Sequence, residues 1–124
     1  MNYTPWLVAA ALIVLFLLAK RLSLISPAKA RSLLTRGAAV IDVRSPSEFR
    51  GRHLPGALNV PLDRLGDEIA RRAPDKSQPL LLHCLSGTRS AMAKAVLKKM
   101  GYRDVHNLGS YARAARLAGN PRPS

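Results

Sequence analysis

A single cysteine, Cys84, is followed by a short segment that contains a glycine and an arginine. The segment from Cys84 to Ser90 reads C-L-S-G-T-R-S, after the apolar run P-L-L-L-H and before a helical pattern. We therefore expect it to join a buried strand to the first turn of a helix. Backbone N–H groups at a helix N-terminus carry partial positive charge and favour anions. Gly87 permits a tight turn, and Arg89 adds a fixed cation.

This combination predicts an anion-binding loop with a reactive sulfur at its rim. A cysteine beside cations and a helix N-terminus has a lowered pKa and reacts as the thiolate. We predict Cys84 and Arg89 as the catalytic pair and a substrate-binding loop around them, in which Ser90 either contacts the sulfur or caps the helix. A lone cysteine after three leucines can instead be a buried small hydrophobic residue. The predicted loop residues are Leu85, Ser86, Gly87, Thr88 and Ser90.

Helical and strand patterns alternate along the chain and position this loop. The patterns predict helices over 27–36, 46–51, 61–72, 88–100 and 111–118 and strands over 38–43, 58–60, 79–84 and 105–107. In the helix over 88–100, the spacing of Met92, Ala95, Val96 and Met100 predicts the inward face. Such alternation predicts an α/β fold with a central parallel sheet flanked by helices. Cys84 then lies at the carboxyl end of the most apolar strand, where ligands bind in such folds.

The chain resembles the rhodanese family of sulfurtransferases from about Ser26 to Tyr111. The resemblance rests on I-D-V-R-S-P-S-E-F at 41–49, H-L-P-G-A-L-N-V-P-L at 53–62 and the C-L-S-G-T-R-S loop, with N-L-G-S-Y at 107–111 as a weaker match. It implies a central parallel sheet and a cysteine thiolate that accepts a sulfane sulfur as a persulfide. The implied partners are a small anionic sulfur donor such as thiosulfate and a thiol or cyanide acceptor.

The resemblance also assigns roles to individual positions. Cys84 matches the sulfur-carrying cysteine, and residues 85–89 match the loop whose amides hold the persulfide and the substrate anion. Asp42 matches an aspartate that braces a neighbouring loop or a basic side chain. Leu85 and Ser110 depart from the family, which often has a polar residue and a second glycine at these positions.

Three further side chains near these motifs have predicted places of their own. Arg44 follows Asp42 at a strand end and is expected to line the pocket mouth. His53 is expected to support the structure by bonding nearby backbone, and His83 points to the opposite face of the sheet from Cys84. We predict no cofactor and no metal site, because the chain has one cysteine and three scattered histidines.

Two rival interpretations stay open for the domain. Cysteine-dependent protein phosphatases place the arginine one position further from the nucleophile than Arg89 is from Cys84, so their larger loop disfavours that activity. A non-catalytic, membrane-tethered rhodanese-like module that binds or senses a ligand is the second alternative. The intact Cys84 and Arg89 favour the enzyme, since a scaffold needs neither residue.

Residues 1–19 contain no charged side chain, and Trp6 to Ala19 is unbroken apolar sequence. We predict a membrane anchor over 1–21, with lipid contact through residues 3–21, a rhodanese-like domain over 22–119 and a disordered tail over 120–124. A cleaved signal peptide carries cations before its apolar run, whereas Lys20 and Arg21 follow this one. A buried core helix is disfavoured by the lack of a polar face.

The basic residues predict the orientation and the partners of the chain. Lys and Arg total 20 against 7 Asp and Glu, a formal charge of +13. Basic residues just after the apolar run place the domain in the cytoplasm, on a bacterial inner membrane, by the positive-inside rule. The charge would attract anionic substrates or anionic lipid. Nucleic acid binding is not expected, because only 5% of residues are aromatic and half of these lie in or near the anchor.

Overall fold

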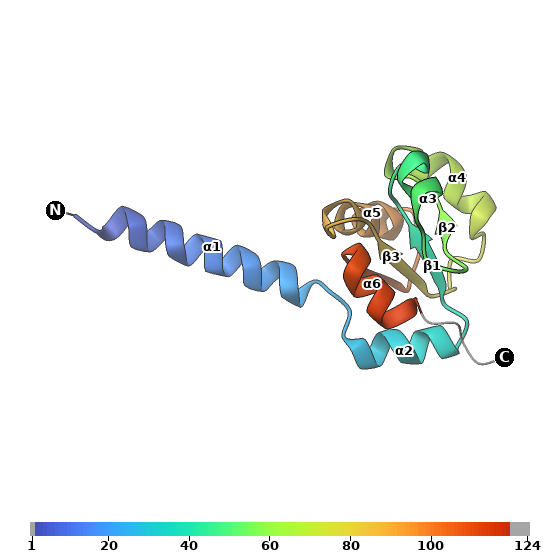
Figure 1. Cartoon of the computed structure of the whole chain (residues 1–124), viewed down its shortest axis with the longest axis horizontal. Helices are drawn as coiled ribbons and strands as arrows, with labels where there is room; N and C mark the ends of the chain where they lie inside the picture. Colours follow the sequence, from blue (N-terminus) through green and yellow to red (C-terminus); the bar gives the residue numbers. More distant parts are fainter. Residues whose placement is uncertain (1, 120–124) are drawn as a thin grey trace.

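A sheet of four parallel strands lies at the centre of the domain in the computed structural model, which describes residues 2–119 (Figure 1). The strands are β1 (Ala39–Asp42), β2 (Leu58–Asn59), β3 (Leu80–His83) and β4 (Val105–Gly109), in the order β2-β1-β3-β4. Val40 of β1 pairs with Leu81 of β3, and Leu81 pairs in turn with His106 of β4. The predicted α/β fold with a parallel central sheet is confirmed.

Six helical segments connect or flank these strands. They are α2 (Pro27–Thr35), α3 (Pro46–Gly51), the 3-10 turn η1 (Leu62–Arg64), α4 (Leu65–Arg72), α5 (Thr88–Lys99) and α6 (Tyr111–Ala118). Ser26 caps α2 by accepting from the Lys29 N–H, and Ser45 and Glu48 form a capping box at the start of α3. The single helix expected over 61–72 is instead divided between η1 and α4.

The alternating side chains of the strands build one core on each face of the sheet. Leu80 and Leu82 pack with Cys84 and with residues of α4 and α5 on one face. Leu81 packs on the other face with residues of α2 and α6. The reactive loop therefore lies on the face that α4 and α5 cover, at the carboxyl end of β3.

The predicted inward face of α5 is wrong except at Met100, which is partly buried and packs against the core. Met92, Ala95 and Val96 are exposed, whereas Ser90, Ala93 and Leu97 are buried and Met100 is half-buried. α5 has apolar residues on its exposed side as well as on its buried side, so their spacing alone did not identify the side that faces the core. β4 is also longer than the predicted 105–107, because pairing with β3 extends to Gly109. The predicted tail over 120–124 lies outside the described residues.

The N-terminal helix α1 (Thr4–Leu22) projects away from the domain (Figure 1). None of its residues is buried, and it is long and apolar enough to cross a membrane. The chain that follows is fixed to the sheet edge: Leu24 bridges to Asn107, and the Ile25 N–H donates to the Asn107 carbonyl at 3.0 Å. Arg113 on α6 also donates to the Ile25 carbonyl. Leu24 and Ile25 are therefore part of the domain rather than a free linker.

Candidate active site

Cys84 lies at the end of β3, where the chain leaves the sheet and turns into α5. Its N–H donates to the Gly109 carbonyl at 3.2 Å, which continues the pairing with β4 for one more residue. The sequence had suggested a sulfur at the rim of the loop. Instead, the residue is fully buried, so the sulfur lies inside the loop. The apolar strand keeps the residue in the core while the loop folds over it.

Hydrogen-bond donors of the loop surround the sulfur. The Gly87 N–H donates to Sγ at 2.9 Å, and the Ser90 hydroxyl lies 3.5 Å from Sγ. Burial alone raises the pKa of the Cys84 thiol, but the Ser90 hydroxyl and the backbone N–H groups of Ser86, Gly87 and Ser90 outweigh it, so the pKa is lowered. The loop therefore stabilises the thiolate of Cys84 relative to that of an ordinary cysteine.

The Ser90 hydroxyl contacts the sulfur and does not cap α5. Gly87 is the N-cap residue of α5, and no side chain caps this helix. The buried Ser90 hydroxyl instead contacts Sγ and the Gly87 carbonyl, the latter at 3.1 Å. The interpretation of Ser90 as a capping residue is wrong, and its contact with the sulfur agrees with its prediction as a loop residue of the site.

The loop after β4 holds the reactive loop in shape. The Tyr111 N–H donates to the Leu85 carbonyl at 3.0 Å, and Ser86 and Ser110 form an antiparallel bridge. Gly87 has φ +99°, and a Cβ there would approach the Gly109 backbone to 3.4 Å. A side chain at residue 87 would be strained in this left-handed conformation. Ser110 therefore helps to hold the reactive loop in shape, although this position departs from the glycine that the family often has there.

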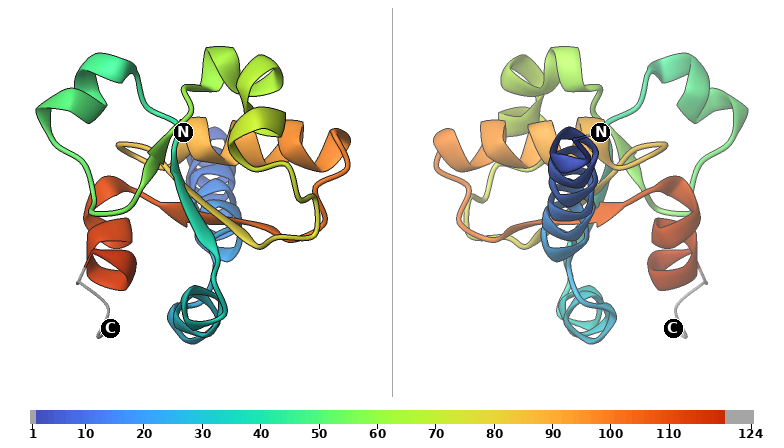
Figure 2. Two further views of the ribbon diagram at one scale, coloured as in Figure 1. Left: turned by 90° about the vertical axis from the view of Figure 1, so that its right-hand side faces the viewer. Right: turned by 90° about the vertical axis from the view of Figure 1, so that its left-hand side faces the viewer.

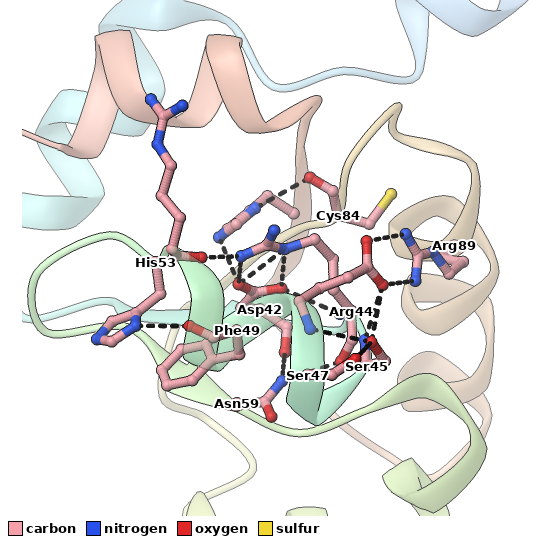
Figure 3. Close-up of polar contacts among 12 residues, drawn as sticks. Asp42, Arg44, Ser45, Ser47, Phe49, His53, Asn59, Cys84 and Arg89 are labelled. Carbon is pink, nitrogen blue, oxygen red and sulfur yellow. Dashed lines mark hydrogen bonds and ion pairs between the residues drawn. The ribbon is translucent and has the colours of Figure 1, made fainter.

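Arg89 is paired with Glu48 at the entrance to the site (Figure 3). Its two terminal nitrogens donate to the two carboxylate oxygens of Glu48 at 2.7 and 3.1 Å. The Arg89 hydrogen bond lowers the pKa of Glu48 to about 2, so both partners are charged at neutral pH. Arg89 was predicted as a fixed cation of the loop, and its partner Glu48 was not among the predicted site residues.

Arg44 does not line the pocket mouth as predicted. Its guanidinium is buried and donates to both oxygens of Asp42, at 2.7 Å for the closest contact, and to the Arg52 carbonyl (Figure 3). It also lies over the Tyr111 ring, 4.8 Å from the centroid. Asp42 is fully buried and braces this basic side chain, as its match to the family implied. Arg44 thus stabilises the fold on the far face of the sheet, because residues 42 and 44 point away from Cys84.

The two histidines near the motifs take structural places. His53 Nδ1 lies 2.8 Å from the Phe49 carbonyl, and its ring stacks on Phe49, as expected of a side chain that bonds nearby backbone. His83 is fully buried and lies edge-on to Tyr111. Figure 3 shows the sulfur of Cys84 pointing away from the Asp42–Arg44 pair, and His83 lies beside that pair. Among the described residues, the hydrogen-bond partners of the sulfur are Gly87 and Ser90 and include no histidine.

The remaining predicted loop residues surround the sulfur without touching it through their side chains. Leu85, Ser86 and Thr88 are exposed, and Arg89 is half-buried. A cleft of about 450 Å³ beside the loop is lined by Val43, Ser45, Pro61, Leu62, Asp63 and Arg89. Arg89 faces a space that a small anion can enter, while Cys84 is buried and is not among the residues that line the cleft. The described residues contain no cluster of His, Cys, Asp and Glu able to hold a metal ion.

Comparisons with known proteins agree with this arrangement. A family model described as rhodanese-like domain matches residues 26–113. The thiosulfate sulfurtransferase PspE of Escherichia coli is 41% identical over 69 residues, which cover 56% of this chain and 66% of that protein. The thiosulfate sulfurtransferase GlpE of Pseudomonas syringae is 33% identical over 84 residues, 68% of this chain and 77% of that protein. The matched stretch spans just under two thirds of the PspE length.

A solved structure extends the comparison to three dimensions. A structure described as rhodanese with anions from E. coli has a TM-score of 0.60 at 36% identity. The match covers 62% of this chain and 91% of that one. The similar part is the domain that carries Cys84, and most of that chain has its counterpart here.

Proposed function

The chain belongs to the rhodanese family, and we propose that it is a sulfurtransferase that carries a sulfane sulfur on Cys84. The observation that carries the proposal is the ring of donors around Sγ, with Gly87 N–H at 2.9 Å and Ser90 Oγ at 3.5 Å. Donors that stabilise a thiolate can also stabilise the negative charge of a persulfide. The names of the relatives PspE and GlpE support thiosulfate as the first donor to test.

The reaction needs two displacements at sulfur. The Cys84 thiolate attacks the outer sulfur of thiosulfate, a new S–S bond forms, and the bond to the sulfite group breaks with its electron pair leaving on sulfite. An acceptor, either cyanide or a thiolate, then attacks the outer sulfur of the persulfide. The Cys84 thiolate leaves in this second step, and the enzyme returns to its starting state. The lowered pKa of Cys84 favours the thiolate that this attack requires.

The entrance to the site suits a small anion. Arg89 lines the cleft beside the loop, and its guanidinium presents a planar set of donors beyond those that Glu48 occupies. The formal charge of +13 adds a long-range attraction for anionic donors. The E. coli structure described as rhodanese with anions supports an anionic ligand at this kind of site.

We also propose that α1 anchors the enzyme in a membrane with the domain in the cytoplasm. All of α1 is exposed although it is almost wholly apolar, so a water-soluble monomer would leave this surface uncovered. Its last turn contains Lys20 and Arg21, and Lys29 and Arg31 follow closely. Basic residues on this side of an apolar helix favour the cytoplasmic side.

The activity is tested by thiocyanate formation from thiosulfate and cyanide with the full chain in detergent. We expect turnover by the wild type and none by Cys84→Ser. Ser77→Ala is a matched control, because Ser77 is exposed and lies in the loop before β3. The anchor is tested by membrane fractionation: the chain should stay in the membrane pellet after alkaline extraction. Turnover in Cys84→Ser would refute the assignment of the nucleophile, and release by alkali would refute the anchor.

A further inference from the structure

Two of the three exposed large apolar side chains of the domain lie on α5. Outside residues 3–22, the exposed large apolar side chains among the described residues are Leu85, Met92 and Val96. Leu85 follows Cys84 in the reactive loop, and the other two lie on α5. The exposed fractions of Leu85 and Met92 are 57% and 56%. A group of this kind on one surface indicates a contact with something apolar.

The outer surface of α5 is mainly apolar and ends in a lysine. Met92, Ala95 and Val96 are exposed on neighbouring positions of the helix surface, with Lys99 on the same side. The opposite side, with Ala93 and Leu97, packs into the core. The helix is thus apolar on both sides, which explains why its spacing predicted the wrong buried face.

α5 lies beside the base of the apolar helix α1. A cleft of about 230 Å³ between them is lined by Phe16 and Lys20 of α1 and by Thr88 and Ala91 of α5. Figure 2 shows α5 lying across the direction of α1, and in its right-hand view α5 faces the viewer, on the side from which α1 emerges. The contacts of Leu24 and Ile25 with β4 hold the two helices in this relation.

Basic side chains lie beyond the Ala95 edge of this surface. Lys94 and Lys98 lie on α5, and Lys29 at the start of α2 is close enough to act on Lys94: burial, Lys98 and Lys29 together lower the pKa of Lys94. Lys20 and Arg21 end α1. No described acidic side chain forms an ion pair with any of these five residues. The basic side chains can therefore bind anionic lipid headgroups.

We propose that the outer face of α5, defined by Met92, Ala95, Val96 and Lys99, rests with Leu85 on an anionic lipid surface. The proposal depends on the proposed anchoring by α1. The apolar side chains enter the boundary between headgroups and acyl chains, and the lysines bind lipid phosphates. The reactive loop then opens at headgroup level, so the enzyme exchanges sulfur with molecules at the membrane surface.

The test places an environment-sensitive fluorophore on the full chain in vesicles. In the Cys84→Ser background, a new cysteine is labelled either at Met92→Cys or at Ala70→Cys. Ala70 is exposed on α4, which lies on the side of the domain away from α1 (Figure 1). Vesicles contain phosphatidylcholine alone or mixed with phosphatidylglycerol. Trp6, the one tryptophan in the chain, reports insertion of α1 independently.

With phosphatidylglycerol present, we expect a blue-shifted emission at residue 92 that brominated lipids quench, and no such change at residue 70. The shift should be smaller in phosphatidylcholine alone or in the double variant Lys94→Glu/Lys98→Glu, and unchanged in the control Arg64→Glu/Arg71→Glu. If Trp6 is quenched but residue 92 behaves like residue 70, α1 is anchored and the α5 proposal is wrong. If Trp6 itself stays in water, the anchoring fails and the α5 proposal fails with it.

Discussion

The guanidinium of Arg89 lies against the carboxylate of Glu48, 41 residues earlier in the chain, with both terminal nitrogens donating. The pair brings α3 to the start of α5 and cancels most of the charge that Arg89 would otherwise present to the sulfur. Stabilisation of the Cys84 thiolate is therefore assigned to the nearer donors, the Ser90 hydroxyl and the loop amides. Arg89 is left to hold an incoming anion at the entrance.

This division of roles predicts that Ser90→Ala raises the pKa of Cys84. The variant removes the hydroxyl 3.5 Å from Sγ but keeps the backbone N–H groups. We expect sulfur transfer to slow by about 10-fold, since a hydrogen bond to a charged group contributes roughly 1.5–3 kcal/mol at best geometry. The pH dependence of Cys84 alkylation measures the pKa. Ser86→Ala is the control, because that exposed side chain makes no described contact with the sulfur. Equal alkylation profiles for both variants would contradict the assignment.

A different outcome is expected for Arg89→Ala. Loss of the guanidinium should lower kcat/KM for thiosulfate by about 10- to 150-fold, because a charge-assisted contact contributes roughly 1.5–3 kcal/mol. Its effect on the alkylation profile of Cys84 should be smaller than that of Ser90→Ala. Arg89→Lys should restore only part of the activity, because an ammonium group does not reproduce the planar donor set. Full activity in Arg89→Ala would exclude a role in anion binding.

Glu48→Gln tests whether the carboxylate restrains Arg89. The amide oxygen can still accept from Arg89 and from Ser45, while one negative charge leaves the entrance. We expect KM for thiosulfate to fall by about 2- to 5-fold, equivalent to an exposed charge interaction of under about 1 kcal/mol. An increase in KM would contradict this expectation.

The Glu48 carboxylate also makes the wild type sensitive to acid, because folding lowers its pKa from an ordinary value of 4.5 to about 2. The stability that the carboxylate contributes is lost as pH falls through that range.

His83 predicts a second, separate loss of stability in mild acid. Burial lowers its pKa from 6.5 and outweighs the opposing charge of Asp42, while Arg44 adds to the lowering. The unfolded chain therefore binds the proton more readily than the folded one, and stability falls as pH drops below about 6.5. Urea unfolding at about pH 7.5 and about pH 5.5 measures the difference, which His83→Gln should reduce. An equal pH dependence in both proteins would show that other groups cause it.

Truncation at two points tests where the domain begins. Removing residues 1–21 should give a soluble, folded domain, because none of α1 is buried. Removing residues 1–25 should destabilise it by about 2–5 kcal/mol, since Ile25 is a core residue and its N–H pairs with β4. Circular dichroism and urea titration compare the two. An insoluble or unfolded product lacking 1–21 would make α1 a part of the core and contradict the membrane anchor.

The strand and loop pattern near Cys84 was readable from local sequence, since an apolar run and a glycine-containing turn have short-range signatures. The Ser45–Glu48 capping box was also readable, because its two residues lie three positions apart. The pairing of Glu48 with Arg89 left no local mark, as it depends on how α3 packs beside α5. The roles of Ser110 and Asn107 could not be predicted for the same reason. Ser110 pairs with Ser86, and the Asn107 side chain donates to the Gly87 carbonyl, so both support the reactive loop from a segment distant in sequence.

The misplaced residues have two different physical causes. Arg44 was assigned to the pocket mouth because it follows Asp42 at a strand end, but the buried Asp42 carboxylate and the Tyr111 ring compensate its desolvation on the other face of the sheet. Met92 and Val96 were assigned to the core because they are apolar and helically spaced. Spacing shows that a helix has an apolar stripe but does not distinguish a protein core from another apolar surrounding.

The most direct test of the account is intact-protein mass spectrometry after incubation with thiosulfate and removal of the excess donor. We predict a gain equal to one sulfur atom on the wild type, located at Cys84 by peptide mapping and lost on addition of cyanide. The Cys84→Ser protein should gain nothing. A wild type that acquires no sulfur from thiosulfate or from other persulfide donors, while correctly folded, would contradict the sulfurtransferase account and favour a binding module.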